Sequence, residues 1–557
     1  MARKKALSNI DAAWLHMDDP TNLMMITGFF EFEEKLDYER LKATTEVRMV
    51  RRWRRFRQRV RESRLPMRGP YWEDDPYFDI ENHVLEIGLP SPGDEATLKE
   101  MISKLASRPL DRSKPLWEFH LVENLSTGGS FLVVRLHHAI ADGIALMSVL
   151  MSLCDVDPDA PWPKPESEKA HRRRGRRVRS LFHPAASFFA ATRSMADEGK
   201  SMLTHPGHFL KRASQAKAFT ARLARLAFLP PDKRTVFKGK LGRKKVVAWT
   251  RDLPLEDVKQ IKTAFGVTVN DVLMAVVAGG LREYLLARGE RVPNGLSIRA
   301  MVPVNLRPLE ESTKLGNYFG LVVMALPLGM EGPLDRVMEV KRRMDDLKNS
   351  PEAVVGYTLL EVMGMTPTEI ENLAVQFFAM KSTLVLTNVP GPRQPLYFAG
   401  SPIKRIMFWV PQSGRLGMGV SIFSYAGSVS VGVMTDDGLV SDPEAIADFM
   451  EKDFARMLAM TEEIKAQEYE GLDAEPEEEA AESSETPESE ADASPDESDS
   501  DDDAPDESVE EDEEEVGGDE EIADEDRCIA ITKSGERCKN RALPGSSYCR
   551  VHAHLAE

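Results

Sequence analysis

Short apolar runs alternate with helical patterns along the first part of the chain. Phe131–Leu136 (FLVVRL) is apolar and rich in β-branched residues, which predicts a buried strand. Gly143–Cys154 (GIALMSVLMSLC) follows a short polar loop and is predicted to be a helix. This order places the loop at the carboxyl end of the strand, where a rigid scaffold often carries chemistry. We therefore expect a first α/β unit that ends near residue 157.

A second α/β unit is expected from about Lys244 to Ala466. Thr268–Leu286 is predicted to be a long helix, with Thr268 and Asn270 as possible N-caps. A late run of strands among the helices indicates a mixed sheet. The predicted strands are Ser297–Val304, Gly320–Leu328 and Thr383–Leu386, then a hairpin of Gly417–Tyr425 and Val429–Met434 around Ala426-Gly427.

The segment between the two units is basic. A proline-rich break precedes the basic run His171–Arg179 (HRRRGRRVR), and residues 180–229 have a helical pattern with Lys and Arg among the apolar positions. Such a helix can lie on an anionic lipid surface. It can equally be a solvated crossover helix, because an apolar stripe is also what core packing needs. The sequence leaves both interpretations open.

Charge divides the chain into a basic body and an acidic tail. The net charge is -19, yet residues 467–526 contain 32 Asp and Glu and no Lys or Arg. The segment after this tract has a net charge of +4, so residues 1–466 carry +9. A basic body attracts anions such as nucleotide phosphates or an acidic lipid surface. The acidic tract is predicted to be disordered, because it cannot bury enough apolar surface to offset chain entropy.

The loop after the first predicted strand reads HHAIADG, from His137 to Gly143. The imidazole of His138 can remove a proton from a hydroxyl near neutral pH. Asp142 can brace the loop or hold a cation, and Gly143 allows a sharp entry into the next helix. The alternative is a pair of structural histidines beside a turn. The complete motif after a buried strand favours catalysis by His138.

Several further short motifs follow one another along residues 7–465. Together, and in this order, they resemble the bacterial wax ester synthase/diacylglycerol acyltransferase family, within the CoA-dependent acyltransferase superfamily. Besides HHAIADG, they are Leu7–Gly28 (LSNIDAAWLHMDDPTNLMMITG), Pro115-Leu116-Trp117, Asn270-Asp271, Val302–Pro308 (VPVNLRP), Gly316-Asn317 and Asn388–Pro392 (NVPGP).

The resemblance implies an α/β fold of two chloramphenicol-acetyltransferase-like subdomains with mixed sheets and an active-site tunnel between them. It assigns the general base to His138 and largely structural roles to His137 and Asp142. The acyl-CoA and the acceptor would enter from opposite ends of the tunnel, and acyl-CoA would be a substrate, with no cofactor needed for catalysis.

With these boundaries, we expect five segments along the chain. Residues 1–157 form the N-terminal acyltransferase subdomain, residues 158–243 a basic linker with crossover helices, and residues 244–466 the C-terminal subdomain. Residues 467–526 form the disordered acidic linker and residues 527–557 a small metal-binding tail. The basic run, the acidic tract and this tail lie outside the family pattern.

The supporting motifs allow two interpretations each. Pro115, Leu116 and Trp117 either buttress the substrate tunnel or pack the core. Asn270 and Asp271 either position a substrate and orient the catalytic loop, or cap the following helix, since Asn and Asp favour N-caps. The NVPGP turn either lines the thioester pocket or simply ends a strand.

The C-terminal tail holds a candidate zinc site. Three of the four cysteines, Cys528, Cys538 and Cys549, lie there with His552, and a Cys3His set suits tetrahedral structural zinc. A segment of this size could not build a core without metal. His554 is a possible substitute ligand, and three unrelated reduced cysteines are the alternative.

The leading functional hypothesis is an O-acyltransferase that moves a fatty acyl group from acyl-CoA to diacylglycerol or to a long-chain alcohol. A condensation-type enzyme that uses carrier proteins and a non-catalytic lipid-surface scaffold are the alternatives. No signal peptide or spanning segment of ~20 apolar residues is visible, and cysteine is scarce. We expect a cytoplasmic protein in peripheral contact with the membrane or lipid droplets. No nucleic-acid partner is expected, because the acidic tract repels phosphate.

Overall fold

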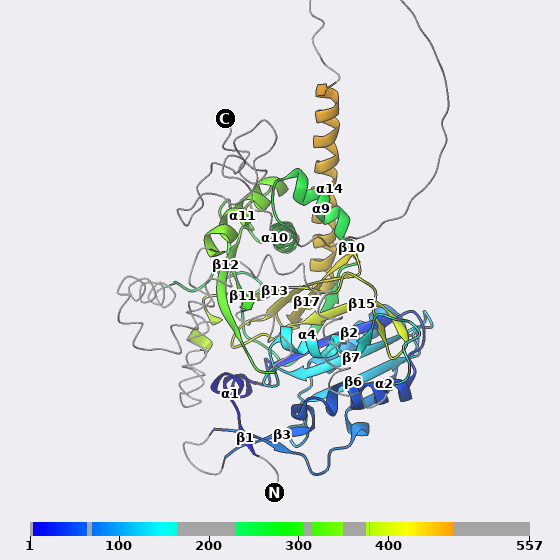
Figure 1. The fold of residues 1–557 in the computed structure, drawn as a ribbon. Coiled ribbons are helices and arrows are strands. Elements are labelled where there is room, and N and C mark those ends of the chain that lie inside the picture. Colours follow the sequence, from blue (N-terminus) through cyan, green and yellow to red (C-terminus); the bar gives the residue numbers. More distant parts are fainter. Residues whose placement is uncertain are drawn as a thin grey trace, which may run out of the picture. The chain divides into compact units, whose positions relative to one another are not determined.

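The computed structural model describes residues 4–63, 69–163, 229–305, 315–348, 375–377 and 379–472. Two seven-stranded mixed sheets organise these residues (Figure 1). The first sheet has β2 at its centre, and its neighbour β7 is buried along its whole length. In sheet order its strands are β5 (Val84–Gly88), β6 (Trp117–Glu123), β7 (Ser130–His137), β2 (Met25–Phe32), β15 (Ser401–Trp409), β14 (Tyr397–Phe398) and β8 (Cys154–Asp155).

The second sheet joins parallel and antiparallel strands. β13 pairs in parallel with both β11 and β16, while β12 and β17 lie antiparallel to their neighbours. Its strands in order are β10 (Leu253–Pro254), β17 (Ser428–Asp436), β16 (Met418–Tyr425), β13 (Leu384–Pro390), β11 (Ile298–Asn305) and β12 (Phe319–Leu326), with β9 (Lys245–Trp249) also paired to β17.

One stretch of the chain crosses from the second sheet to the first and back. After β13, the chain adds β14 and β15 to the first sheet, where Trp409 of β15 pairs with Thr27 of β2. It then returns to the second sheet as β16. The two sheets are therefore joined by a strand, and the two halves of the sequence do not coincide with the two sheets.

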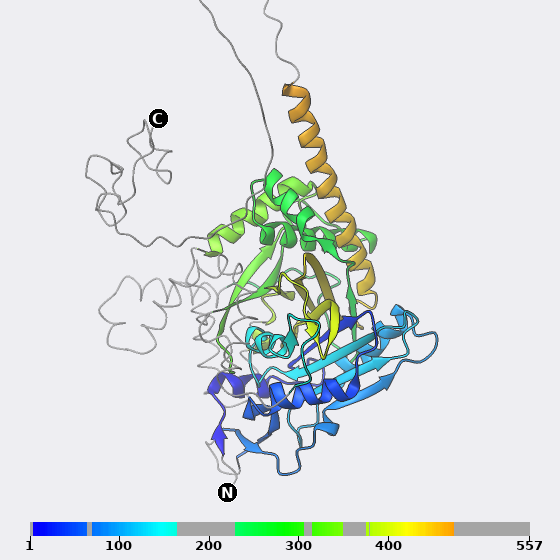
Figure 2. The ribbon, with the colours of Figure 1, turned by 45° about the vertical axis from the view of Figure 1, so that its right-hand side comes forward.

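Most helices pack on the sheets. Figures 1 and 2 show α9, α10 and α11 gathered at one side of the second sheet, with the long α14 beside them. A small third sheet of β1 (Lys5–Ala6), β4 (Tyr71–Asp74) and β3 (Gln58–Arg61) follows the N-terminus. The helices are α1 (Asn9–His16), α2 (Tyr38–Thr45), α3 (Glu95–Ala106), α4 (Gly143–Met151), α9 (Leu255–Ala264), α10 (Val269–Ala287), α11 (Pro333–Lys348) and α14 (Pro443–Leu472), with helical turns at Glu46–Val50, Arg54–Arg57 and Ile80–Asn82.

The predicted strands and the hairpin are confirmed to within a few residues. The hairpin turn falls at Ala426 and Gly427, whose φ angles of 46° and 86° are the left-handed values that a tight two-residue turn requires. The prediction for Gly143–Cys154 was wrong at its end. The helix stops at Met151, and Cys154 pairs with Phe398 of β14 instead, so a sheet edge ends the apolar run.

The basic run, nearly all of the helical pattern at 180–229, the acidic tract from residue 473 onward and the predicted zinc ligands lie outside the described residues. The start of the disordered linker at residue 467 was predicted wrongly, because α14 continues as a helix to Leu472. Within the part that the structure describes, no single helix is long and apolar enough to cross a bilayer. Only α9 and α10 taken together reach that length and composition, and they meet at a bend of 98°.

Candidate active site

The HHAIADG loop joins β7 to α4, and every residue from His137 to Asp142 is buried. β7 ends between β6 and β2, with His137 paired to Met25. α4 begins at Gly143 directly after its N-cap, Asp142. The predicted order of strand, loop and helix is confirmed, so the loop is held between two buried elements.

His138 is held by its backbone, and its ring lies between aromatic side chains. Its N–H donates to the carbonyl of Met24 at 2.8 Å. The ring stacks on Trp14, with 4.1 Å between centroids and 26° between planes, and lies 5.7 Å from the tilted ring of Phe319. Among the described residues, the ring Nδ1 has no hydrogen-bond partner. A buried imidazole with a ring nitrogen left over has an atom available for chemistry.

Burial decides the charge of His138. Burial, and after it the charge of neighbouring His137, lowers the pKa of His138 to about 3, although the Asn317 side chain and the backbone of His138 act in the opposite direction. The ring is therefore neutral near neutral pH. A neutral imidazole is the form that can accept a proton from a substrate hydroxyl.

His137 uses one ring nitrogen in a hydrogen bond, while the other, Nε2, has no hydrogen-bond partner among the described residues and lies near Asp18. Its Nδ1 accepts the Ala139 N–H at 3.0 Å, and its Nε2 lies 3.6 Å from Oδ2 of Asp18. Asp18 also accepts from the N–H of Met24 and from Arg112. Burial alone would raise the pKa of Asp18, but His137 and these donors lower it to about 2. Its charge holds His137 against the loop, which fits a structural role.

Asp142 connects the loop to the second sheet. Its Oδ1 accepts the N–H of Ala145, which caps α4, and its Oδ2 accepts the N–H of Tyr318, both at 2.9 Å. Its own N–H donates to the carbonyl of Gly316 at 3.2 Å. Gly316 has a φ of 130°, a value that side chains disfavour, which accounts for glycine here. These contacts favour the bracing role of Asp142 over a cation site.

Asn317 completes the link. Its Nδ2 donates to the carbonyl of His138 at 3.0 Å and to Oδ1 of Asp11 at 2.8 Å. The predicted Gly316-Asn317 motif thus contacts both ends of the HHAIADG loop. Sequence analysis assigned no role to Asp11 or Trp14. Their only signal was their place in the Leu7–Gly28 motif, three residues apart as on one helix face.

Asn270 and Asp271 differ in what they do. Asp271 and Thr268 form a capping box: the Asp271 side chain accepts from the Thr268 N–H, and the Thr268 hydroxyl accepts from the Asp271 N–H. Asn270 is inside the helix, so its prediction as an N-cap was wrong. Its Oδ1 accepts from Asn388 at 3.0 Å, and its buried Nδ2 has no partner within the described ranges. A substrate-positioning role for Asn270 stays a prediction.

Pro115, Leu116 and Trp117 support the first histidine from β6. The carbonyl of Leu116 accepts the N–H of His137 at 3.0 Å, and the Leu116 side chain lines a small cleft beside it. The buried Trp117 ring stacks on His83 at 4.6 Å, and its Nε1 donates to the carbonyl of Phe56. These contacts favour packing, and substrate contact by this motif stays a prediction.

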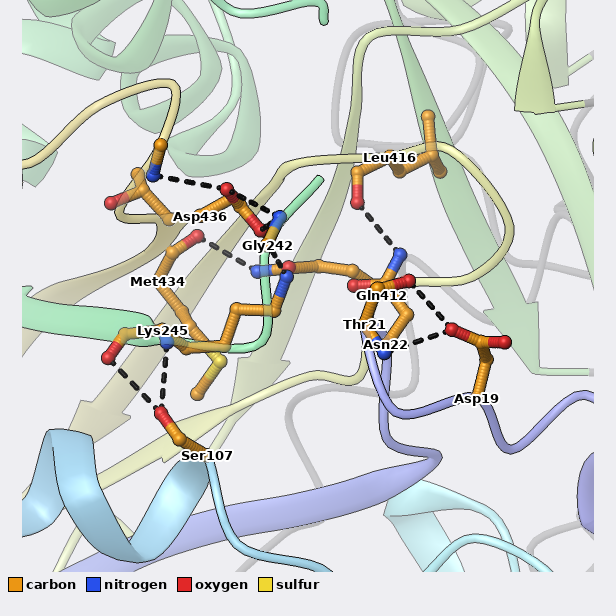
Figure 3. Close-up of polar contacts among 12 residues, drawn as sticks. Asp19, Thr21, Asn22, Ser107, Gly242, Lys245, Gln412, Leu416, Met434 and Asp436 are labelled. Atoms are coloured by element: carbon orange, nitrogen blue, oxygen red, sulfur yellow. Dashed lines mark hydrogen bonds and ion pairs between the residues drawn. The ribbon is translucent and has the colours of Figure 1, made fainter. Parts of the chain in front are cut away.

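A second cleft shares Leu23 and Met25 with the first. It is lined by residues of both halves of the sequence, among them Asn22, Lys245 and Gln412. Asn22 donates to the carbonyl of Leu416 at 3.0 Å, as Figure 3 shows, and also to the carbonyl of Gly414 at 2.9 Å. The segment that binds His138 and His137 is therefore anchored to the loop between β15 and β16.

One residue that lines this cleft, Lys245, forms a buried ion pair. Lys245 Nζ lies 2.7 Å from Oδ2 of Asp436, and Asp436 also accepts the N–H of Gly242 (Figure 3). Across the described ranges, no group of three or more His, Cys, Asp or Glu side chains could hold a metal ion. The predicted ligands Cys528, Cys538, Cys549 and His552 are outside those ranges, and their zinc site stays a prediction.

Solved structures define the class of this fold. A wax ester synthase/diacylglycerol acyltransferase from Marinobacter aquaeolei VT8 superposes with a TM-score of 0.58 at 21% identity, over 82% of this chain and 100% of that one. The first condensation domain of the calcium-dependent antibiotic synthetase gives 0.51 at 15% identity, over 82% and 96%. The fold is thus the one shared by condensation domains and chloramphenicol-acetyltransferase-like enzymes.

Sequence comparison gives the family. The wax ester synthase/diacylglycerol acyltransferase catalytic domain matches residues 7–273, and the C-terminal domain of the same family matches residues 315–458. A probable diacylglycerol O-acyltransferase of Mycobacterium tuberculosis, tgs1, is 32% identical over 423 residues, 74% of this chain and 86% of that protein. The chain belongs to the wax ester synthase/diacylglycerol acyltransferase family, as its motifs predicted.

The bracing role of Asp142 can be tested by substitution. Asp142→Ala removes the α4 cap and the bond to Tyr318, so we expect lower activity and a loss of about 1–3 kcal/mol in the free energy of unfolding. Asp142→Asn should recover most of the stability, because Asn is also a good N-cap. Urea denaturation and acyl-transfer rates measure both effects. Asp94→Ala, which removes the exposed cap of α3, is the control and should leave activity unchanged. Lost activity at unchanged stability in Asp142→Ala would indicate direct participation instead.

The buried histidines predict the pH dependence of stability. Burial lowers the pKa of His138, His83 and His120 below the ordinary value of 6.5. The unfolded chain therefore takes up protons below pH 6.5 that the folded chain does not, and stability falls as the pH decreases from 6.5 towards 5. Urea denaturation of wild type and His138→Gln across this range should show a slope smaller by up to about 1.4 kcal/mol per pH unit in the variant. Equal slopes would contradict a neutral, buried His138.

Proposed function

We propose that this chain transfers a fatty acyl group from acyl-CoA to diacylglycerol or a long-chain alcohol, with His138 as the general base. The observation that supports this most directly is the buried, neutral imidazole of His138, with its Nδ1 unpartnered among the described residues, in a complete HHAIADG loop. Membership of an acyltransferase family supplies the reaction type. The names of the relatives suggest diacylglycerol as an acceptor.

In the proposed reaction, His138 takes the hydroxyl proton as the alcohol oxygen attacks the thioester carbonyl. The tetrahedral intermediate then collapses, the carbon–sulfur bond breaks, and the protonated His138 returns its proton to the departing thiolate. The products are an ester and CoA, and His138 ends neutral, as it began. No covalent acyl-enzyme is required, so no second nucleophile is needed.

The two alternatives have weaker support. The likeness to a condensation domain, at 15% identity, concerns the fold, and carrier-protein substrates have no support in the sequence relatives. A non-catalytic scaffold would not need an intact His138 with two neighbouring elements holding it. Because both acceptors are lipids, we also propose that the protein meets them at a membrane or lipid-droplet surface.

The test is a direct assay of the purified full-length protein. Radiolabelled palmitoyl-CoA is offered with diolein and hexadecanol side by side, and the labelled triacylglycerol and wax ester are separated. His138→Ala should lower transfer to either acceptor by about 10²–10⁴-fold, the range that positioned acid–base catalysis supplies, without a large change in melting temperature. His120→Gln removes another buried histidine, on β6, and is the matched control that should stay active.

The products decide between the functions. Labelled triacylglycerol, wax ester or both from wild type identifies the acceptors. Wild-type protein that makes neither, but acylates a substrate held on a carrier protein, would establish the condensation-type alternative. Full transfer by His138→Ala at an unchanged melting temperature would refute the general-base role.

A further inference from the structure

The short helix α1 contacts the catalytic loop through two buried side chains. Ser8 caps the helix by accepting the N–H of Asp11 at 3.1 Å. Asp11 and Trp14 are three residues apart, so they share one face of the helix. Their exposed fractions are 2% and 7%, and both reach the HHAIADG loop or its partners. A carboxylate and an indole on such a face require an explanation beyond packing.

Trp14 lies against the ring of His138. In the stacked contact at 4.1 Å the indole face is inclined by 26° to the imidazole, and Phe319 lies 5.8 Å from Trp14 at the same site. An aromatic face attracts a cation far more than a neutral ring, and tryptophan does so best. When His138 accepts a proton, the contact therefore becomes more favourable. It stabilises the charged state that the reaction forms and restricts the ring to one orientation.

Asp11 orients two donors that hold the backbone of the loop. Its Oδ1 accepts from Asn317, and its Oδ2 lies 3.3 Å from Nη1 of Arg55. The same two side chains bind alternate carbonyls of the loop: Asn317 binds that of His138 at 3.0 Å, and Arg55 binds that of Ile140 at 2.7 Å. The single carboxylate of Asp11 thus contacts both side chains that bind the loop, Asn317 and Arg55.

Asn317 and Arg55 are themselves held by the residues around them. Arg55 lies over the ring of Trp72 at 4.8 Å, and Asn317 is 3% exposed. Burial raises the pKa of Asp11, whereas Arg55 and Asn317 lower it, so the carboxylate depends on both partners to stay charged. Loss of the carboxylate would free Asn317 and Arg55 to turn away from the loop.

We propose that α1 is a positioning element of the active site. Trp14 stabilises the protonated form of His138, and Asp11 acts through Asn317 and Arg55 to hold the loop that carries it. The inference rests on the proposed role of His138, and it gives a role to Asp11 and Trp14, which lie in the Leu7–Gly28 motif.

The first test compares substitutions of Trp14 in the full-length protein. Trp14→Leu should lower kcat by about 10-fold with KM changed by less than about 2-fold, because the indole acts on the protonated state rather than on substrate binding. Trp14→Phe keeps an aromatic face and should recover most of kcat. Ile10→Ala removes a buried side chain from the same helix and is the control for simple destabilisation. Equal kcat values for Trp14→Leu, Ile10→Ala and wild type would overturn the role of Trp14.

The second test is a double-mutant cycle. Asp11→Ala and Asn317→Ala should each lower kcat by about 10–100-fold, the cost of a loop displaced by about 1 Å. If Asp11 acts through Asn317, the double variant should be little slower than the slower single variant. Multiplying losses would show that the two residues act independently and would contradict the proposal.

The variants distinguish the role of His138 from the role of α1. Full activity in His138→Ala removes the general-base role of His138, on which the role of α1 rests. An inactive His138→Ala together with unimpaired kcat in Trp14→Leu and Asp11→Ala leaves the proposed function intact and overturns only the role of α1.

Discussion

The hydrogen bonds between the HHAIADG loop and the segment before β12 are the constraint on which the site depends. Asp142 accepts from Tyr318, and Asn317 donates to the carbonyl of His138. The loop belongs to the first sheet and its partners lead into the second, so the position of His138 is set by both. Within a buried region these few bonds matter, because an unpaired polar group there costs about 1–3 kcal/mol.

Other contacts between the two halves of the sequence also hold the HHAIADG loop in place. β15 leaves the second half of the sequence to pair with β2, and Asn22, just before β2, bonds the loop that brings the chain back. The segment between α1 and β2 in turn binds the backbone of His138 and the side chain of His137. The neutral imidazole of His138 is held by contacts with several segments that are far apart in the sequence.

Local patterns predicted much of this arrangement. β7, α10 and the β16–β17 hairpin follow from apolar periodicity and turn residues, and the HHAIADG loop was placed correctly between a strand and a helix. Local patterns failed where several residues suited one role: Thr268, Asn270 and Asp271 are all good caps, and only geometry separates them. They also failed for Asp11, whose partner Asn317 lies 306 positions away and leaves no periodic signal.

The crossing strand has a consequence for synthesis on the ribosome. β2 and β7 emerge early, yet the second edge of β2 has no partner until Ser401–Trp409 of β15 has left the exit tunnel. Until then, the nascent chain exposes a row of unpaired amide and carbonyl groups on an apolar strand, which is a template for wrong pairing. The first sheet is thus completed only after almost the whole catalytic body has been translated, and nascent protein must be protected from aggregation until that moment.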